Sequence, residues 1–391
     1  MINKIIFLID SPLYKRDYKR YGVSIFMNHG FKVYFFNISP IINPILFRKA
    51  TKKNIYVGKN EKVFNNINSF VDEINLLKNS FIISFVHFNY NSNRIYRAIS
   101  KANIFYAINI LNCVPTKLKN RFSHFTKINK RQINIFNLIK NRLFQPKNAK
   151  FFGIKGPKLL LAGGEESTYH PQAQISNKKQ KILWLHTFDY DIYLKDRNNK
   201  IKENQNLAVF VDAPSPRFKH DAHIKGIKSP LTEERYYPSL CKFFDRIESE
   251  FNVNIIICAH PKTEHEEFPS YFGGRKTIYG KTSEMIRSSK LIINRNSTSV
   301  NFAVLYNKPI IFHTSNELET NVAMSTQVHS MASWLGKVPI NIDNSLDLDW
   351  DSELLVNSES YLEYKESFIK KSESKNELLW ETVLKEIKGL K

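Results

Sequence analysis

The stretch EERYYPSLCKFFDRIESEFNVNIIICAHP, residues 233–261, decides the fold class of this chain. Residues 233–251 carry apolar side chains at the spacing of one helix face, namely Tyr236, Tyr237, Leu240, Phe243, Phe244 and Ile247. Residues 253–258 form a short β-branched run, which is typical of a buried strand. A long helix followed at once by a buried strand indicates a parallel α/β sheet.

The same alternation continues on both sides of this stretch. Further strands are predicted at 5–9, 32–36, 81–86, 104–108, 158–162, 182–185, 207–211, 291–293 and 309–312. Helices are predicted at 18–28, 282–288 and 299–306, with one or two more over 358–388. The pattern predicts an α/β fold with two Rossmann-like domains that face a central cleft.

The polar stretch 195–206 separates the two halves of this pattern. We therefore predict an N-terminal Rossmann-like domain over 1–200 and a second Rossmann-like domain over 201–350. The C-terminal helices, over 351–391, are expected to pack back toward the N-terminal domain.

The composition of the 391 residues indicates a folded protein, because 42% are hydrophobic and 13% aromatic. No window of about 18 uncharged apolar residues occurs, so no membrane-spanning helix is expected. The first apolar run ends at Asp10 and lacks a cleavage site, which favours a buried strand over a signal peptide and predicts a cytoplasmic protein. The scattered Cys113, Cys241 and Cys258 are expected to be free thiols.

The net charge of +22 would suit nucleic acid, an anionic membrane surface or acidic small substrates. Residues 117–158 contain many Lys and Arg, no acids and interleaved apolar side chains, which is typical of a peripheral contact with the inner face of the cytoplasmic membrane. A core-facing helix with a solvated basic face fits this segment equally well. No recognisable nucleic-acid-binding motif accompanies the charge, so nucleic acid is not an expected partner.

The first group of candidate site residues follows the strand at 253–258 and consists of His260, Pro261 and Lys262. Pro261 restricts His260 to an extended backbone conformation and so fixes the exit of the strand. The imidazole of His260 can donate to a phosphate oxygen, and Lys262 adds positive charge. A structural role is the more common one for a lone histidine.

Two further groups lie where helices begin. Asn296, Ser297, Thr298 and Ser299 precede the helix at 299–306, where hydroxyl groups can cap the helix and also bind a phosphate. Gly280, Lys281 and Thr282 lead into the helix at 282–288. They do not form a P-loop, because Arg275 occupies the position of its first glycine.

The order of these motifs, followed by Lys308-Pro309-Ile310-Ile311, resembles the nucleotide-binding half of bacterial GT-B glycosyltransferases. It is most similar to the sialyl-, polysialyl- and capsule Kdo-transferase group, whose members use CMP-activated sugar acids. The resemblance covers residues 207–315. It implies a GT-B fold in which His260 and Pro261, together with Ser297, Thr298 and Ser299, meet the phosphate and nucleotide of the donor.

The base that would deprotonate the acceptor is harder to assign, because the acidic motif of that group is absent in its usual form. Asp189 and Asp191 are our candidates, since acids at i and i+2 leaving a strand point to the same side. His186 could orient one of them. A turn or capping role is the alternative for each Asp, and a DxD metal site is a less favoured one.

Other residues expected to line the cleft or contact the acceptor lie in loops after predicted strands. They are Asp10, Glu165, His186, Asp212 and Arg217.

Taken with the resemblance, these residues predict an inverting, metal-independent transferase without a cofactor. It would move a nonulosonic or Kdo-like sugar acid from a CMP donor to lipopolysaccharide or capsule glycan. The alternatives are a GT-B transferase with a UDP-, GDP- or CDP-linked donor, a sugar-nucleotide epimerase and a basic nucleic-acid-binding protein.

Overall fold

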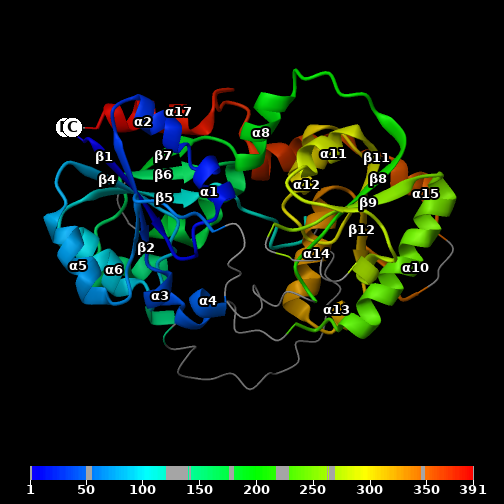
Figure 1. The fold of residues 1–391 in the computed structure, drawn as a ribbon, viewed down its shortest axis with the longest axis horizontal. Coiled ribbons are helices and arrows are strands. Elements are labelled where there is room, and N and C mark those ends of the chain that lie inside the picture. Colours follow the sequence, from blue (N-terminus) through cyan, green and yellow to red (C-terminus); the bar gives the residue numbers. More distant parts are fainter. Residues whose placement is uncertain are drawn as a thin grey trace. The chain divides into compact units, whose positions relative to one another are not determined.

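The computed structural model describes residues 2–49, 55–119, 140, 142–175, 180–216, 229–261, 263, 269–344 and 348–390. The chain forms two compact units. Unit 1 contains the described residues within 1–113, 129–188 and 370–391, and unit 2 contains those within 114–128 and 189–369. In each unit a parallel sheet is flanked by helices (Figure 1).

The sheet of unit 1 has seven described strands in the order β3-β2-β1-β4-β5-β6-β7, and each neighbouring pair is parallel. The strands are β1 (Lys4–Ile9), β2 (Lys32–Asn37), β3 (Glu61–Val63), β4 (Ser80–Ser84), β5 (Phe105–Ile110), β6 (Leu159–Ala162) and β7 (Lys181–Trp184). The helices are α1 (Lys15–Arg20), α2 (Val23–Asn28), α3 (Ser39–Ile42), α4 (Pro44–Lys49), α5 (Ile67–Leu76), α6 (Asn93–Lys101), η1 (Pro146–Phe152), η2 (Glu165–Tyr169), η3 (Pro171–Gln174) and α17 (Leu379–Lys388).

The strands of unit 1 are buried on both faces, as is usual for a parallel sheet. Alternate residues of β1 show this, since Ile6 and Leu8 join the core that includes α5 and α6, whereas Ile5 and Phe7 join the core that includes α2 and α17. The helices α2 and α17 lie side by side (Figure 1). Residues 370–391 therefore complete the core of unit 1.

The sheet of unit 2 has six described strands in the order β10-β9-β8-β11-β12-β13, again all parallel. The strands are β8 (Asn204–Val211), β9 (Asn254–Cys258), β10 (Thr277–Ile278), β11 (Ser289–Asn294), β12 (Ile310–Thr314) and β13 (Ile340–Asn341). The helices are α8 (Phe188–Asp196), α10 (Glu233–Phe251), η5 (Pro269–Phe272), α11 (Thr282–Ser288), α12 (Val300–Leu305), α13 (Asn316–Glu319), α14 (Val322–Trp334), α15 (Trp350–Leu354), α16 (Ser358–Tyr364) and the π-helical turn η6 (Lys365–Ile369).

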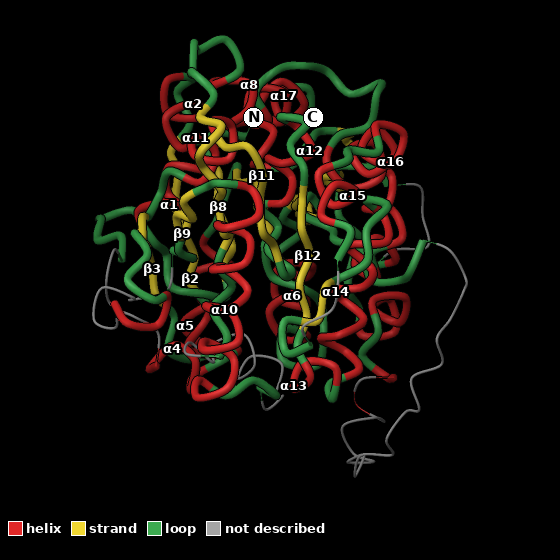
Figure 2. Tube along the Cα trace, turned by 90° about the vertical axis from the view of Figure 1, so that its right-hand side faces the viewer, coloured by secondary structure: helices red, strands yellow, loops and turns green. Residues whose placement is uncertain are grey.

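Unit 2 also has a core on each face of its sheet. The helix α10 supplies the predicted apolar face, from Tyr236 to Phe251, to one core, and α11, α12 and α16 pack on the other. Figure 2 shows α10 alongside the yellow strands of this sheet. The predicted bounds of α10 and α11 are confirmed, and most predicted strands are displaced by only one or two residues.

Each sheet reverses its strand order once. In unit 1 the chain proceeds from β1 to β2 and β3, and then returns to the other side of β1 with β4. In unit 2 the same reversal separates β8 from β11. Such switch points are where doubly wound sheets bind ligands, just beyond the carboxyl ends of the two strands.

The predicted helix over 18–28 is in fact two helices, α1 and α2, which meet at Gly22. Gly22 has φ +62°, and a Cβ built on it would lie 2.4 Å from ring atoms of Trp380. Both the left-handed backbone and the close approach of the indole require glycine here. The break follows from a residue of α17 that the local sequence cannot reveal.

The unit boundaries differ from the predicted domain boundaries. The first boundary lies between Phe188 and Asp189 instead of near residue 200, so all of α8 after its first residue belongs to unit 2. The expected C-terminal segment 351–391 is divided, because α15 and α16 belong to unit 2 and only 370–391 joins unit 1. No helix in the described part of the chain is both long and apolar enough to span a membrane.

Candidate functional site

The switch point of unit 2 brings three loops together through hydrogen bonds. Asp212 follows β8, and its carboxylate Oδ2 accepts a hydrogen bond of 3.4 Å from the backbone N–H of His260, which follows β9. Arg295 follows β11, and its Nη2 donates to the carbonyl oxygen of Ser215, again after β8, at 3.2 Å. The loops after β8, β9 and β11 thus form one connected edge.

His260 occupies a tight turn at this edge. Its carbonyl oxygen accepts from both the backbone N–H and the hydroxyl of Thr263, at 2.9 and 2.7 Å. The side chain is half-buried, and Pro261 is exposed. The strand exit is therefore fixed on both sides of the imidazole, by Asp212 before it and by Thr263 after it.

The loop between β11 and α12 is held largely by its own groups. The side chain of Asn294 accepts from the backbone N–H of Ser297 at 3.1 Å, and the hydroxyl of Ser297 accepts from the N–H of Ser299 at 3.4 Å. The hydroxyls of Thr298 and Ser299 make no hydrogen bond to any described residue, and neither caps α12. Thr298 is exposed and Ser299 is half-buried, so both hydroxyls are available to a ligand.

Arg295 is 2% exposed and lies in a buried polar cluster behind this loop. Its guanidinium lies over the Tyr236 ring, 5.3 Å from the centroid, and its Nε donates to the side chain of Asn296. The Tyr236 hydroxyl lies 3.2 Å from Nε2 of His313. Burial, with a contribution from Arg295, lowers the pKa of His313 to about 3, so this ring is neutral.

The third predicted group, Gly280, Lys281 and Thr282, lies where α11 begins. Gly280 has φ +73° and open space around it, and Lys281 is the N-cap of α11 without a side-chain capping bond. Burial raises the pKa of the Cys258 thiol to about 12, against a hydrogen bond from the Thr282 side chain. The hydroxyl of Thr282 thus contacts Cys258 at the end of β9.

A carboxylate that the sequence did not single out lies beyond β12. Glu319 accepts hydrogen bonds from the Thr314 hydroxyl at 2.5 Å, from the Ser325 hydroxyl and from Nε2 of His329 at 2.9 Å. Partial burial alone would raise the pKa of Glu319, but these hydrogen bonds outweigh it and lower the pKa to about 2. Glu319 is therefore a saturated anion that fixes the start of α14.

Asp189 and Asp191 do not leave a strand, so the geometrical reason for pairing them was wrong. Both lie in the first turn of α8, where residues at i and i+2 point in different directions. The carboxylate of Asp189 accepts from the side chain of Asn301, on α12, at 3.0 Å. The pattern was ambiguous because a strand exit and a helix start look alike over so few residues.

The sequence-predicted residues of unit 1 occupy different places along its carboxyl edge. Asp10 follows β1 at the switch point and is half-buried. Glu165 begins η2 and forms an ion pair of 3.3 Å with Lys371. His186 follows β7 and is fully buried, and its ring nitrogens lie 3.0 and 2.8 Å from the carbonyl oxygens of Thr187 and Glu377. These contacts link the end of β7 to the segment before α17.

Two histidines that the sequence analysis missed meet at this edge. His87 follows β4, and its ring centroid lies 4.9 Å from that of His170, which precedes η3. Desolvation, together with repulsion from His170, lowers the pKa of His87 to about 4, although part of the residue stays open to solvent. Desolvation also lowers the pKa of His170. The available signals were a histidine just after a predicted strand and a second His-Pro dipeptide, His170-Pro171.

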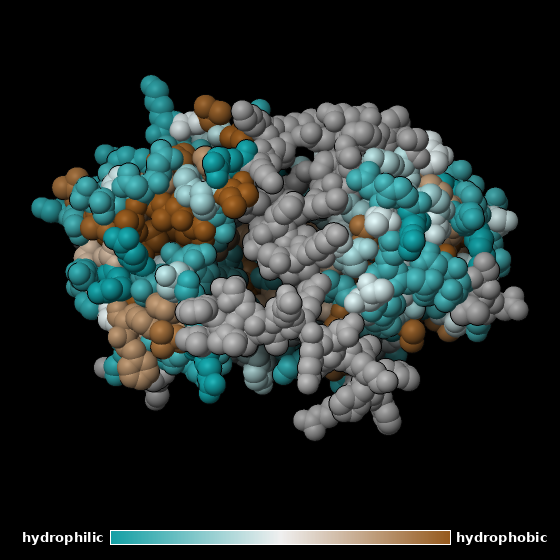
Figure 3. Space-filling view, turned by 90° about the horizontal axis from the view of Figure 1, so that it is seen from below, coloured by the Kyte–Doolittle hydropathy of each residue, from teal (hydrophilic) through white to brown (hydrophobic). Residues whose placement is uncertain are grey.

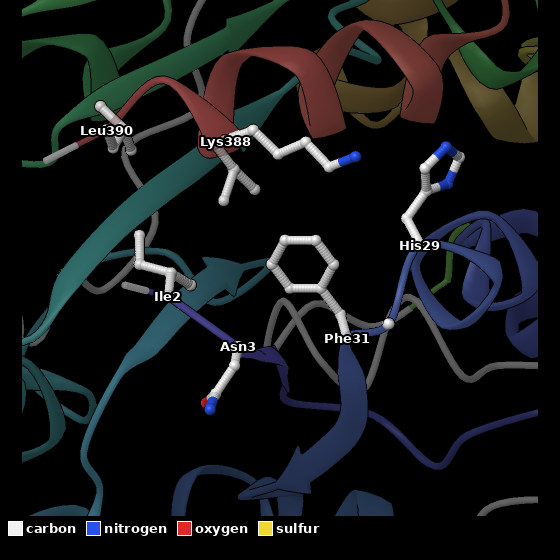
Figure 4. Close-up of a pocket in the computed structure, with 8 residues that line it drawn as sticks. Ile2, Asn3, His29, Phe31, Lys388 and Leu390 are labelled. Atoms are coloured by element: carbon white, nitrogen blue, oxygen red, sulfur yellow. The ribbon is translucent and has the colours of Figure 1, made fainter.

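The opposite edge of the unit 1 sheet has an open pocket of about 420 Å³. Its lining includes Ile2, Asn3, His29, Phe31 and Lys388, and the Lys388 side chain extends toward His29 (Figure 4). These residues precede β1 and β2 or belong to the ends of α2 and α17. The pocket is thus at the amino ends of the strands, away from the switch point.

Some predicted residues fall outside the described part of the chain. These are Arg217, Lys262 and, within the basic segment 117–158, residues 120–139 and 141. In the rest of that segment Phe151 is 88% exposed and Leu143 is 52% exposed. In Figure 3 the described surface of unit 1, at the left, shows larger apolar areas than that of unit 2.

Among the described residues no group of three or more His, Cys, Asp or Glu side chains is placed to hold a metal ion. The three cysteines are free.

No protein-family model matches the chain, and no curated protein matches its sequence. Solved structures do match. The wall teichoic acid polymerase TagF is 12% identical over 99% of this chain and 89% of its own, with a TM-score of 0.51. UGT89C1 of Arabidopsis thaliana is 9% identical over 99% of both chains, with a TM-score of 0.52. The fold is GT-B.

A UDP-GlcNAc 2-epimerase from Methanocaldococcus jannaschii is also similar, with 12% identity over 98% of this chain and 99% of its own and a TM-score of 0.48. At identities this low, the similarity to TagF and UGT89C1 shows the fold alone, and the reaction has to be argued from the chemistry of the site.

Proposed function

We propose that this GT-B chain is a glycosyltransferase that binds a nucleotide-sugar donor at the carboxyl edge of unit 2. The observation that carries the proposal is the connected edge at the switch point, where His260 and Arg295 lie in hydrogen-bonded loops. The hydroxyls of Thr298 and Ser299, which have no hydrogen-bond partner among the described residues, lie in the same loop as Arg295. This is where a doubly wound sheet binds a nucleotide. The resemblance of the same motifs to the sialyl- and Kdo-transferase group favours a CMP-linked sugar acid.

The proposed reaction is an inverting, metal-independent displacement. A hydroxyl of a lipopolysaccharide or capsule glycan attacks the anomeric carbon, and the nucleotide leaves with the bonding electrons. The His260 side chain and the hydroxyls of Thr298 and Ser299 stabilise the charge that develops on the leaving phosphate. Lys262 and Lys281 belong to the same proposal as sources of positive charge.

Unit 1 is proposed to bind the acceptor glycan. The net charge of +22 and the exposed Phe151 and Leu143 support a peripheral location on anionic membrane. Asp10 and Glu165 remain candidates for acceptor contacts, because both lie at the carboxyl edge of the unit 1 sheet.

The direct test is a thermal-shift titration of the whole protein with CMP, CDP, UDP and GDP, each with EDTA, with Mn²⁺ and with neither. A ligand that binds only the folded state raises Tm, and we expect the largest rise with CMP and no change with EDTA. A larger rise with UDP, GDP or CDP would replace the CMP donor, and dependence on Mn²⁺ would overturn metal independence. No shift with any nucleotide would overturn the proposal.

A double variant tests whether the nucleotide binds at the loop between β11 and α12. Replacing both hydroxyls, Thr298→Ala with Ser299→Ala, should raise the Kd for the nucleotide about 10-fold, which corresponds to the loss of about 1.4 kcal/mol. Ser358→Ala, at an exposed serine at the start of α16, is the matched control and should retain the Kd of the wild type.

A further inference from the structure

A pair of histidines at the switch point of unit 1 has the chemistry to handle a proton. His87 follows β4, one of the two strands between which the unit 1 sheet reverses its order. The residue is exposed, and its ring nitrogens make no hydrogen bond to any described residue. An accessible imidazole at this edge can therefore accept a hydrogen bond from a bound hydroxyl.

The backbone under His87 is held firmly. The N–H of the next residue, Phe88, donates to the Gln172 side chain at 2.7 Å, and the carbonyl oxygen of Phe88 accepts from the same amide at 3.1 Å. The His87 carbonyl oxygen accepts from the Ser92 hydroxyl at 2.7 Å. Gln172 is 5% exposed. The fixed backbone therefore gives the point from which the His87 side chain starts a defined position, which helps to place a catalytic group.

His170 is aligned with His87 by the same residue. Its Nδ1 accepts from the backbone N–H of Gln172 at 3.2 Å, so the neutral ring carries its hydrogen on Nε2. The two rings are tilted by 58° at a centroid distance of 4.9 Å. Two imidazoles this close oppose each other's protonation.

Two carboxylates near this edge affect the pKa values of other side chains. The charge of Asp10, after β1, contributes to the raised pKa of Tyr96 on α6. The charge of Glu166, on η2, contributes in the same way to the raised pKa of Cys113. Among the described residues, His170 is the titratable group whose charge lowers the pKa of His87.

We propose that His87 is the catalytic residue that takes the proton from the attacking hydroxyl, and that His170 is a positioning residue for it. The inference rests on the proposed transferase function. The hydroxyl oxygen forms a bond to the anomeric carbon while the bond from that carbon to the phosphate oxygen breaks. The bonding electrons leave with the phosphate, and the proton moves to a ring nitrogen of His87. This assignment replaces Asp189 and Asp191 as the base.

The test measures nucleotide release from CMP-sialic acid, UDP-glucose and GDP-mannose, with water as the attacking hydroxyl. His87→Gln should lower the rate on the accepted donor about 100-fold or more, with the thermal shift by the nucleotide unchanged. His29→Gln is the matched control, because His29 is exposed at the amino ends of the same strands, and it should retain the rate.

A second variant separates catalysis from a structural role. His170→Asn should move the acidic limb of the rate–pH profile to higher pH, because it removes the repulsion that opposes protonation of His87. A wild-type rate in His87→Gln, or an unchanged profile in His170→Asn, would overturn the inference and leave the proposed function intact. Absence of nucleotide binding and release by the wild type would overturn both.

Discussion

The two His-Pro dipeptides of this chain have the same local constraint and different surroundings. His260-Pro261 follows β9 in unit 2, where Asp212 and Thr263 fix the backbone and the side chain is half-buried. His170-Pro171 precedes η3 in unit 1, where Gln172 fixes the His170 ring and a second histidine faces it. A dipeptide thus sets the backbone, and residues distant in sequence decide what its imidazole can do.

The comparison predicts that the two dipeptides differ most in turnover. His260→Ala should lower the rate of nucleotide release about 100-fold or more, because it removes a group that stabilises the leaving phosphate. His170→Ala should lower the rate only about 10-fold, since His170 acts through His87. Steady-state rates of both folded variants, compared with the wild type, make the measurement. An equal fall in rate in the two variants would show that the two dipeptides do not differ in their contribution to turnover. A wild-type rate in His260→Ala would show that His260 does not stabilise the leaving phosphate.

A smaller effect is expected on stability. Gln172→Ala should lower the free energy of unfolding by about 1–3 kcal/mol, because the buried N–H and C=O groups of Phe88 lose their partner. Urea denaturation of the whole protein, followed by far-UV circular dichroism, gives the value.

Gln174→Ala, at an exposed glutamine of the same 3₁₀ helix, should change the free energy of unfolding by less than about 0.5 kcal/mol. Equal destabilisation by the two substitutions would show that the His170-Pro171 turn does not depend on the Gln172 side chain.

The smallest expected effect is on pH dependence. The pKa of His87 is lowered in the folded chain to about 4, so the unfolded chain binds the proton first as the pH falls. Stability is then fully present above about pH 6.5 and is lost between pH 6.5 and 4. His87→Asn should reduce this loss by about 1 kcal/mol, since solvent screens the partly open ring. The urea midpoints of variant and wild type at pH 7 and pH 4.5 test this prediction. An equal fall of the midpoint between the two pH values in both proteins would contradict it.

The sheets could be predicted because buried parallel strands are continuous apolar runs bounded by polar loops. Strands such as β1, β8 and β9 were located within a few residues, and α10 was predicted with its full apolar face. These features depend on local sequence periods. The placement of His260, Asn296 and Ser299 at loops after or between elements followed from the same periods.

Long-range contacts set the limits of prediction. The break at Gly22 depends on Trp380, and the position of His87 depends on Gln172 and His170. No local pattern links residues so distant in sequence. The start of α8 was missed for a different reason, because Phe188-Asp189-Tyr190-Asp191 is too short to distinguish a helix from a strand exit.

The position of Trp380 has a consequence for the order of folding during synthesis. Its indole Nε1 donates to the carbonyl oxygen of Arg20 at 2.6 Å, and its ring packs edge-on against Phe7 and Phe26. The ribosome adds Trp380 only after all the described strands of unit 2, from β8 to β13, have been made. The nascent strands of unit 1 must therefore wait with one face only partly covered, by α2, while unit 2 is made. Chaperones that recognise apolar surface have their longest opportunity at this face of the first sheet.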